Sequence, residues 1–371
     1  MPRLSVCLIT KNESRDLARC LASVRGLADE IVVVDTGSTD DTVAIAQAHG
    51  ARVLHHAWRH DFADARNVSL DAATGDWVLV LDADDEVPSD TAAQIPCLLA
   101  EAERARPPID GLTMLYHSPM PAGEAVAFTE YPVLRLFRNR PEFRFRQAIH
   151  EQVLPAIQAA GGRVDGCALR LTHYGYLRPT VQGGQARSQR DREIIEGVLR
   201  REPDNAYMWF QLGALALREG HPGEAELYLE RASRLADRLG PTERALTERL
   251  LSGLAYQAGD ARAALSHAEA SLAAEPGERN TLGLLSWAQA HVALGQRAAD
   301  DAAAAARPDL PPQAYSEALI RLDVSRKHFA AARRGYAQLS AATDLATAAR
   351  DQMAHNRQLC EQLLGPGHDA L

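Results

Sequence analysis

The chain has 371 residues, enough for two or three domains that each bury a core. With 46% hydrophobic and 24% charged residues, its composition is that of an ordinary globular protein, and no apolar run approaches the ~20 residues of a membrane span. A net charge of -9 disfavours a general nucleic-acid binder. The five scattered cysteines fit neither a disulfide framework nor a paired zinc site. No signal-peptide pattern precedes the first strand pattern, so we expect a cytoplasmic protein.

Residues 4–110 alternate between apolar β-branched runs and segments with helical spacing, which is typical of βα units. The expected strands are 4–9, 31–34, 51–54 and 77–81, and the expected helices are 14–25 and 40–49. From 111 to 175 the pattern changes to a strand pair, a short helix at 150–160 and a last strand at 168–173. The sequence therefore predicts an α/β domain with a mixed, mainly parallel sheet that carries an antiparallel cap.

After residue 180 the chain becomes rich in Ala, Leu, Arg and Glu, which indicates a domain boundary. Positions around Trp209, Gly213, Gly220 and Ala225 recur at matching offsets around Leu251, Gly259 and Ala264, and two weaker copies follow. Small residues at such spacings resemble the tetratricopeptide (TPR) repeat, an antiparallel helix pair that stacks on the next pair. We expect an α/β domain at 1–180, a linker, lid and connecting helix at 181–203, and a helical-repeat domain at 204–365.

Two segments are basic, although the chain as a whole is acidic. Residues 135–146 contain Arg135, Arg138, Arg140, Arg144 and Arg146, and residues 187–201 contain Arg187, Arg190, Arg192, Arg200 and Arg201. Either segment could bind an anion, although a solvated basic face is the default interpretation.

Carboxylates follow the buried strand 77–81, in the sequence Asp82-Ala83-Asp84-Asp85-Glu86. In an open α/β sheet, ligands bind beyond the carboxyl ends of the strands. Clustered carboxylates repel one another unless a cation lies between them, and their hard oxygen atoms favour Mg²⁺ or Mn²⁺. The alternative is an acidic turn that caps the next helix.

Polar residues also follow two other strands. Asp35 ends strand 31–34 and is followed by a Gly37 turn and by Ser38, while Thr10-Lys11-Asn12-Glu13 follows the first strand. Capping explains Ser38 but not Asp35, which could accept hydrogen bonds from a nucleobase or ribose. Three strand ends therefore point to one ligand site.

These segments, together with Trp58 and the run 61–67, occur in an order and spacing that resemble the family 2 glycosyltransferases of the GT-A fold, over about the first 180 residues. In that family a nucleotide sugar lies across the strand ends. The resemblance implies that Asp82 and Asp84 form the DxD metal site for Mn²⁺ or Mg²⁺. The nucleotide-binding set that it implies is Thr10, Asn12, Glu13, Asp35, Gly37, Ser38, Arg66, Asp82 and Ala83. His55, His56, His60 and Asp61 form no evident tetrahedral zinc set.

An inverting transferase needs a general base that takes the proton from the acceptor nucleophile. Glu151 resembles the family's acidic catalytic residue, although its motif reads His150-Glu151 instead of the commoner Glu-Asp. A glutamate at a helix start also often serves only the helix dipole, and Glu130 is the reserve candidate. His173 resembles the histidine that joins the metal or the diphosphate, and the following Gly183-Gly184 segment is flexible enough for a lid.

The leading hypothesis is an inverting, metal-dependent glycosyltransferase with a UDP-sugar donor, whose fusion to TPR-like repeats resembles the sublancin-type peptide glycosyltransferases. A concave helical surface suits a peptide or protein acceptor, and a cell-surface glycan or a lipid-linked precursor is the alternative. A catalytically inactive nucleotide-binding scaffold and a nucleotidyltransferase are competing classes. The latter normally has a glycine-rich phosphate loop after its first strand, which residues 10–13 lack. The sequence specifies neither the sugar nor the oligomeric state.

Overall fold

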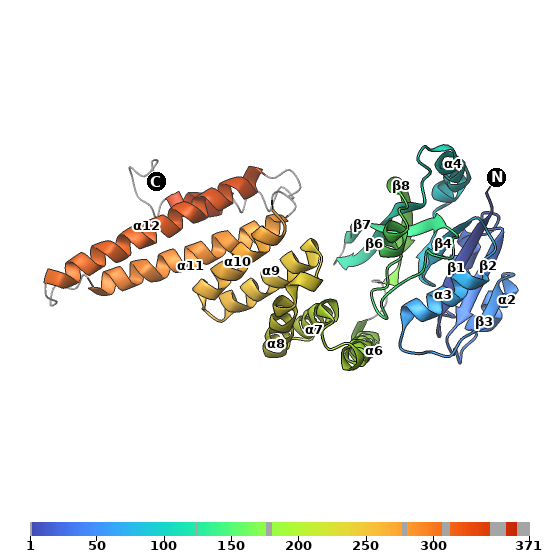
Figure 1. Ribbon diagram of the computed structural model, residues 1–371, viewed down its shortest axis with the longest axis horizontal. Helices are drawn as coiled ribbons and strands as arrows, with labels where there is room; N and C mark the ends of the chain where they lie inside the picture. The colour runs from blue at the N-terminus through green and yellow to red at the C-terminus, as the bar shows by residue number, and fades with distance from the viewer. Residues whose placement is uncertain are drawn as a thin grey trace. The chain divides into compact units, whose positions relative to one another are not determined.

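The computed structural model describes residues 2–122, 125–175, 180–276, 280–305, 312–341 and 354–361. The chain divides into two compact units, Met1–Gly197 and Val198–Leu371 (Figure 1). In the described helices, no stretch is long and apolar enough to span a lipid bilayer.

The first unit is built on an eight-stranded sheet with the strand order β3-β2-β1-β4-β7-β6-β8-β5. The strands are β1 (Leu4–Thr10), β2 (Glu30–Asp35), β3 (Arg52–His55), β4 (Trp77–Leu81), β5 (Asp85–Glu86), β6 (Gly111–Ala122), β7 (Ala125–Arg138) and β8 (Val164–His173). The first four pair in parallel, and β7 joins β4 and β6 in antiparallel pairs. The mixed, mainly parallel sheet expected from the sequence is confirmed.

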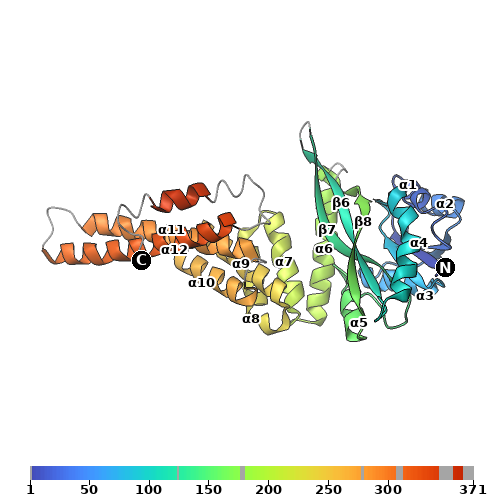
Figure 2. The same ribbon diagram turned by 90° about the horizontal axis from the view of Figure 1, so that it is seen from above.

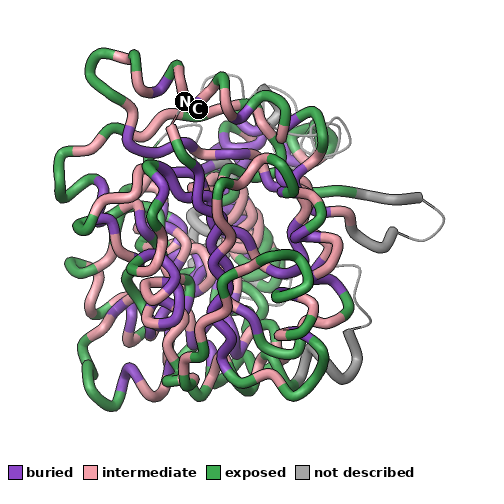
Figure 3. Tube along the Cα trace, turned by 90° about the vertical axis from the view of Figure 1, so that its right-hand side faces the viewer, coloured by how far each residue is buried: buried purple, intermediate pink, exposed green. Residues whose placement is uncertain are grey.

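Helices cover both faces of this sheet (Figure 2). They are α1 (Leu17–Ser23), α2 (Thr42–Ala48), α3 (Phe62–Ala72), α4 (Ser89–Arg104) and α5 (Leu154–Ala159). Successive residues of a strand point to opposite faces, so Leu79 of β4 packs with α1, α2 and α4, whereas Val78 and Val80 pack with α3 and α5. Burial on both faces explains why β4 reads as a continuous apolar run. Figure 3 marks the buried residues in purple.

Two local expectations are wrong. The last strand, β8, pairs in parallel with β6, so the cap is not entirely antiparallel. The short helix expected to start at residue 150 begins only at Leu154, because Gln147 and His150 adopt positive φ angles of 76° and 54°, which a right-handed helix does not allow.

The parallel pairing brings three strand ends to one edge of the sheet. Thr10, at the end of β1, is in register with Asp35, at the end of β2. Leu81 of β4 lies opposite Leu8 of β1, so Asp82 and the acidic residues after it emerge at the same edge. The sheet therefore positions the candidate site.

The described residues of the second unit are mainly helical, as expected. The labelled helices are α7 (Ala206–Arg218), α8 (Pro222–Arg234), the short 3₁₀ helix η2 (Ala236–Arg238), α9 (Pro241–Gln257), α10 (Ala261–Ala274), α11 (Thr281–Ala305) and α12 (Pro312–Ala341). Gly220 and Gly259 occupy the same place in the turns of the α7/α8 and α9/α10 pairs, with φ angles of 80° and 79° that favour glycine. Ala225 and Ala264, at the next matching position, are both fully buried. Helices α11 and α12 are longer than α7 to α10. This difference in length explains why the spacing of the repeat changes in its last copies.

Candidate active site

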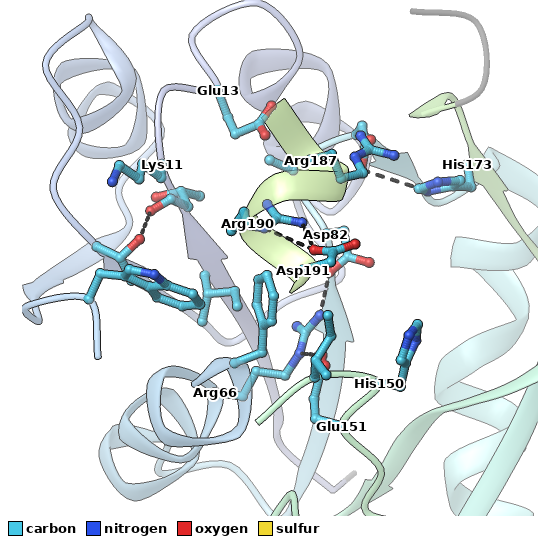
Figure 4. Close-up of a pocket in the computed structure, with 18 residues that line it drawn as sticks. Lys11, Glu13, Arg66, Asp82, His150, Glu151, His173, Arg187, Arg190 and Asp191 are labelled. Carbon is cyan, nitrogen blue, oxygen red and sulfur yellow. Dashed lines mark hydrogen bonds and ion pairs between the residues drawn. The ribbon is translucent and has the colours of Figure 1, made fainter. Parts of the chain in front are cut away.

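A cavity of about 370 Å³ opens at the carboxyl edge of the sheet, within the first unit (Figure 4). Its lining comes from the ends of β1, β2 and β4, from α3 and the loop before it, from the turn at 149–151, from β8 and from α6 (Thr180–Arg201). The lining residues are Ile9, Thr10, Lys11, Glu13, Thr36, Trp58, Phe62, Arg66, Asp82, Ala83, Asp84, Ile149, His150, Glu151, His173, Arg187, Arg190 and Asp191.

Arg66 on α3 pairs with two carboxylates that line the cavity. Its Nε donates to Glu151 Oε1 at 2.5 Å, and its Nη2 donates to Asp82 Oδ1, also at 2.5 Å. The arginine side chain is only 5% exposed, which makes these charge-assisted hydrogen bonds strong and their geometry fixed. Its Nη1 is buried and makes no hydrogen bond within the described part of the chain.

Asp82 is held by a second arginine. Arg135 Nη2, from β7, donates to Asp82 Oδ2 at 2.8 Å. Burial would raise the pKa of Asp82, but Arg135 and Arg66 outweigh burial and hold that pKa well below its usual range. Asp82 is therefore an ionised carboxylate that pairs with the guanidinium groups of two arginines.

The cluster with metal-ligand chemistry consists of Asp84, Asp85 and His173. One ligand atom of each lies within 4.8 Å of the others, and no second cluster of three such side chains occurs among the residues whose positions are described. His173 Nδ1 lies 2.9 Å from Asp85 Oδ1 and 3.6 Å from Asp84 Oδ1. Two carboxylates and one imidazole are suitable ligands for Mn²⁺ and, with less preference for the nitrogen, for Mg²⁺.

Asp85 is fixed by the residues around it. Its Oδ2 accepts hydrogen bonds from the Tyr116 hydroxyl and from the Asp82 backbone N–H, both at 2.7 Å. Burial lowers the pKa of His173, but the hydrogen bond to Asp85 and the neighbouring aspartates outweigh that effect and raise it. A Cβ atom at Gly175 would lie 2.5 Å from His173 Nε2 and 2.9 Å from Asp84 Oδ2, so a larger residue there would displace the side chains of the cluster.

The residues predicted to bind the nucleotide fall into two groups. Thr10, Glu13, Arg66, Asp82 and Ala83 line the cavity. The Thr10 hydroxyl oxygen is buried and makes no hydrogen bond within the described ranges. It is therefore a free polar group in the wall of the cavity.

Asn12, Asp35, Gly37 and Ser38 are not among the lining residues and instead shape the loops behind the cavity. The carboxylate of Asp35 accepts the backbone N–H groups of Gly37 and Ser38 at 3.1 Å each. Burial would raise the pKa of Asp35, but the hydrogen bonds from Ser38 and Gly37 lower it. The backbone N–H of Asn12 donates to Ser38 Oγ at 2.9 Å, which joins the loops after β1 and β2.

Glu151 lies in a tight turn and not at a helix start. The backbones of Arg146 and Gln152 close the turn with hydrogen bonds of 3.0 and 3.1 Å. With the helix beginning only at Leu154, the helix-dipole explanation for Glu151 does not apply. Its carboxylate reaches the cavity as the partner of Arg66 (Figure 4).

Glu130, the reserve candidate for the base, does not line this cavity. Its Oε1 accepts a hydrogen bond from Arg170 Nε at 2.8 Å and lies 3.2 Å from His117 Nδ1. The interaction with His117, followed by that with Arg170, lowers the pKa of Glu130.

Helix α6 contributes residues whose role the sequence did not reveal. The segment around Gly183 and Gly184 is helical, and its role as a lid stays a prediction. Arg187, Arg190 and Asp191 of this helix line the cavity. The guanidinium of Arg190 stacks over the ring of Phe62, with 5.0 Å to its centroid, and Nη2 pairs with Asp191 at 2.8 Å. In the sequence, these arginines could be recognised only as part of the basic segment 187–201. The sequence did not show that this segment lies at the cavity.

The residues considered as zinc ligands do not form a common site. His56 Nε2 instead lies 2.6 Å from Asp64 Oδ2, and His55 Nδ1 lies 3.5 Å from Asp35 Oδ2. All five cysteines are free.

Residues 5–111 match the family model described as "Glycosyl transferase family 2". The first unit carries a family 2 glycosyltransferase domain. Over 281 residues, 73% of the chain and 66% of the relative, the chain is 36% identical to a TPR repeat-containing protein of Synechococcus elongatus. It is 28% identical over 214 residues to the prophage-derived glycosyltransferase SunS of Bacillus subtilis, which covers 57% of the chain and 49% of the relative. The match thus spans less than two thirds of either relative.

Among solved structures, this chain is similar to glucosyl-3-phosphoglycerate synthase of Mycobacterium tuberculosis in complex with Mn²⁺, UDP and glucosyl-3-phosphoglycerate. The TM-score is 0.39 and the identity 21%, over 54% of this chain and 80% of that one.

Proposed function

We propose that the chain is an inverting, metal-dependent glycosyltransferase that moves a sugar from a UDP-sugar to an acceptor. The observation that carries the proposal is the composition of one cavity: Asp84 and His173 of the metal-ligand cluster, Glu151 and the α6 arginines all line it. This set contains the groups that glycosyl transfer from a nucleoside diphosphate needs. The choice of UDP rests on the family resemblance.

Asp84, Asp85 and His173 would hold Mn²⁺ or Mg²⁺, which would stabilise the negative charge that develops on the diphosphate leaving group. Arg187 and Arg190 would contact the diphosphate from α6. Arg66, which also lines the cavity, would contribute positive charge beside the diphosphate or the acceptor. Thr10, at the end of β1, would contact the nucleoside.

Glu151 would remove the proton of the acceptor nucleophile as that nucleophile attacks the anomeric carbon. Arg66 fixes the position of Glu151, and Asp82 with Arg135 fixes Arg66. This chain of ion pairs would fix the carboxylate of Glu151 relative to a bound acceptor.

The test is release of UDP from a panel of UDP-sugars, with Mn²⁺ and with a chelator. We expect release in the presence of Mn²⁺ and at most a trace in its absence. UDP binding with no release from any donor would indicate an inactive scaffold. Formation of pyrophosphate from UTP and a sugar phosphate would instead indicate a nucleotidyltransferase.

The helical repeats would bind the acceptor, for which we propose a peptide or protein over a glycan or lipid-linked precursor. A cut at Gln185 would remove Arg187, Arg190 and Asp191 from the cavity, so the informative truncation ends at Glu202, after α6. The two hydrophobic cores that the described residues form around the sheet lie before this point.

We expect the soluble chain 1–202 to release UDP at a rate within a few-fold of the whole chain. It should transfer far less labelled sugar to the acid-insoluble protein of an extract from the source cells, because remote binding energy positions the acceptor. Undiminished labelling would assign the repeats to another role, such as oligomerisation.

A further inference from the structure

A second cavity, of about 440 Å³, shares one lining residue, Glu151, with the cavity of the candidate active site. It is lined by Thr113, Pro132, Val133, Leu134, Arg135, Phe145, Glu151, Gln152, Val153 and Leu154. Glu151 lines both cavities, whereas Asp84 and His173 line only the first. The second cavity is therefore adjacent to the candidate base and not to the metal-ligand cluster.

The lining of this cavity is mainly apolar. Six of its ten residues are Pro, Val, Leu or Phe, and the guanidinium of Arg135 is already paired with Asp82 at 2.8 Å. Its volume is within the range of small-ligand sites. Two of the lining residues, Pro132 and Gln152, are exposed to solvent. Such a site favours an uncharged, apolar group.

We propose that this second cavity is an acceptor subsite that binds an apolar group attached to the attacking hydroxyl or thiol. The inference rests on the proposed function and specifies its acceptor. In the transfer step the acceptor oxygen or sulfur forms a bond to the anomeric carbon. The bond from that carbon to the diphosphate oxygen breaks with its electron pair, and the acceptor proton passes to Glu151. A base that lines both cavities can serve a donor in one and an acceptor in the other.

The subsite is tested with 1-alkanols from ethanol to hexan-1-ol as acceptors for a UDP-sugar that the whole chain hydrolyses. Each methylene buried in the cavity should raise kcat/KM for alkyl glycoside formation about fourfold. Hexan-1-ol should also slow hydrolysis, because it displaces water next to Glu151. Equal behaviour of ethanol and hexan-1-ol in both measurements would overturn the inference.

Filling the cavity supplies the second arm of the test. Leu154→Trp should abolish the preference for long alkanols and lower the ratio of alkyl transfer to hydrolysis. Gln152→Trp fills the same cavity from an exposed position and replaces the first variant if that one does not fold. The control is Gln94→Trp at an exposed position on α4, which lines neither cavity and should keep the preference.

A filled cavity with an undiminished chain-length preference would also overturn the inference. If the unmodified chain releases no UDP from any donor, the proposed function fails and the inference fails with it. Release of UDP without any chain-length effect contradicts the subsite alone.

Discussion

Replacing Glu151 by glutamine is expected to slow sugar transfer by roughly 10²- to 10⁴-fold, the usual contribution of a general base. The amide keeps the size of the side chain and can still accept the hydrogen bond from Arg66 Nε, so the turn at 146–152 should persist. It cannot take the acceptor proton. Binding of UDP in the presence of Mn²⁺, measured by calorimetry, should stay within a few-fold of the unmodified chain.

Glu130→Gln is the matched control, because it makes the same chemical change at the other candidate base. Glu130 pairs with Arg170 and His117 away from the cavity, so we expect its replacement to leave the transfer rate almost unchanged. A slow Glu130→Gln variant beside an unaffected Glu151→Gln variant would reverse the assignment. If neither variant were slow, no side chain of this pair would be the base.

The strands could be predicted from the sequence because burial on both faces leaves a continuous apolar run. The strand expected at 77–81 matches β4 without a shift, and the first expected strand ends only one residue early. The parallel pairing of β8 with β6 was not predictable, because it joins segments far apart in the chain. Nor was the turn that holds Glu151, since the apolar spacing there also fits a helix and a positive φ at His150 leaves no signature in the sequence.

The site was predictable to the extent that its residues follow strands directly. The resemblance pointed to Asp82, Asp84 and His173 as metal ligands. The structure brings the side chains of Asp84 and His173 together, whereas Asp82 pairs with Arg66 and Arg135 and is not part of the cluster. Asp85 was visible in the acidic run, but its bond to His173 depends on the pairing of β5 with β8. Arg135 was visible in the basic run, but its ion pair with Asp82 depends on the position of β7 beside β4. The sequence thus showed which charged residues are available for the site. Which of them pair with one another depends on the order of the strands in the sheet.

Asp84→Asn is expected to abolish the Mn²⁺ dependence of UDP binding and to lower transfer by at least roughly 10²- to 10³-fold, the scale of losing a preorganised electrostatic contact to the leaving group. The amide has the shape of the carboxylate but no charge to hold a divalent cation. The backbone oxygen of Asp84, which accepts the N–H of Tyr174 at 3.0 Å, is unchanged, so the local fold should remain. UDP titrations with and without Mn²⁺ measure the effect.

The matched control is Asp71→Asn, which removes the carboxylate of an ion pair with Arg144 on the same domain. The Asp71 side chain is 66% exposed, and exposed ion pairs contribute only ~0–1 kcal/mol to stability. This variant should therefore bind UDP with the Mn²⁺ dependence of the unmodified chain. If Asp84→Asn did the same, the cluster of Asp84, Asp85 and His173 would not be the metal site. The two arginines of α6 would then have to balance the diphosphate charge without a cation, and their removal would become the decisive experiment.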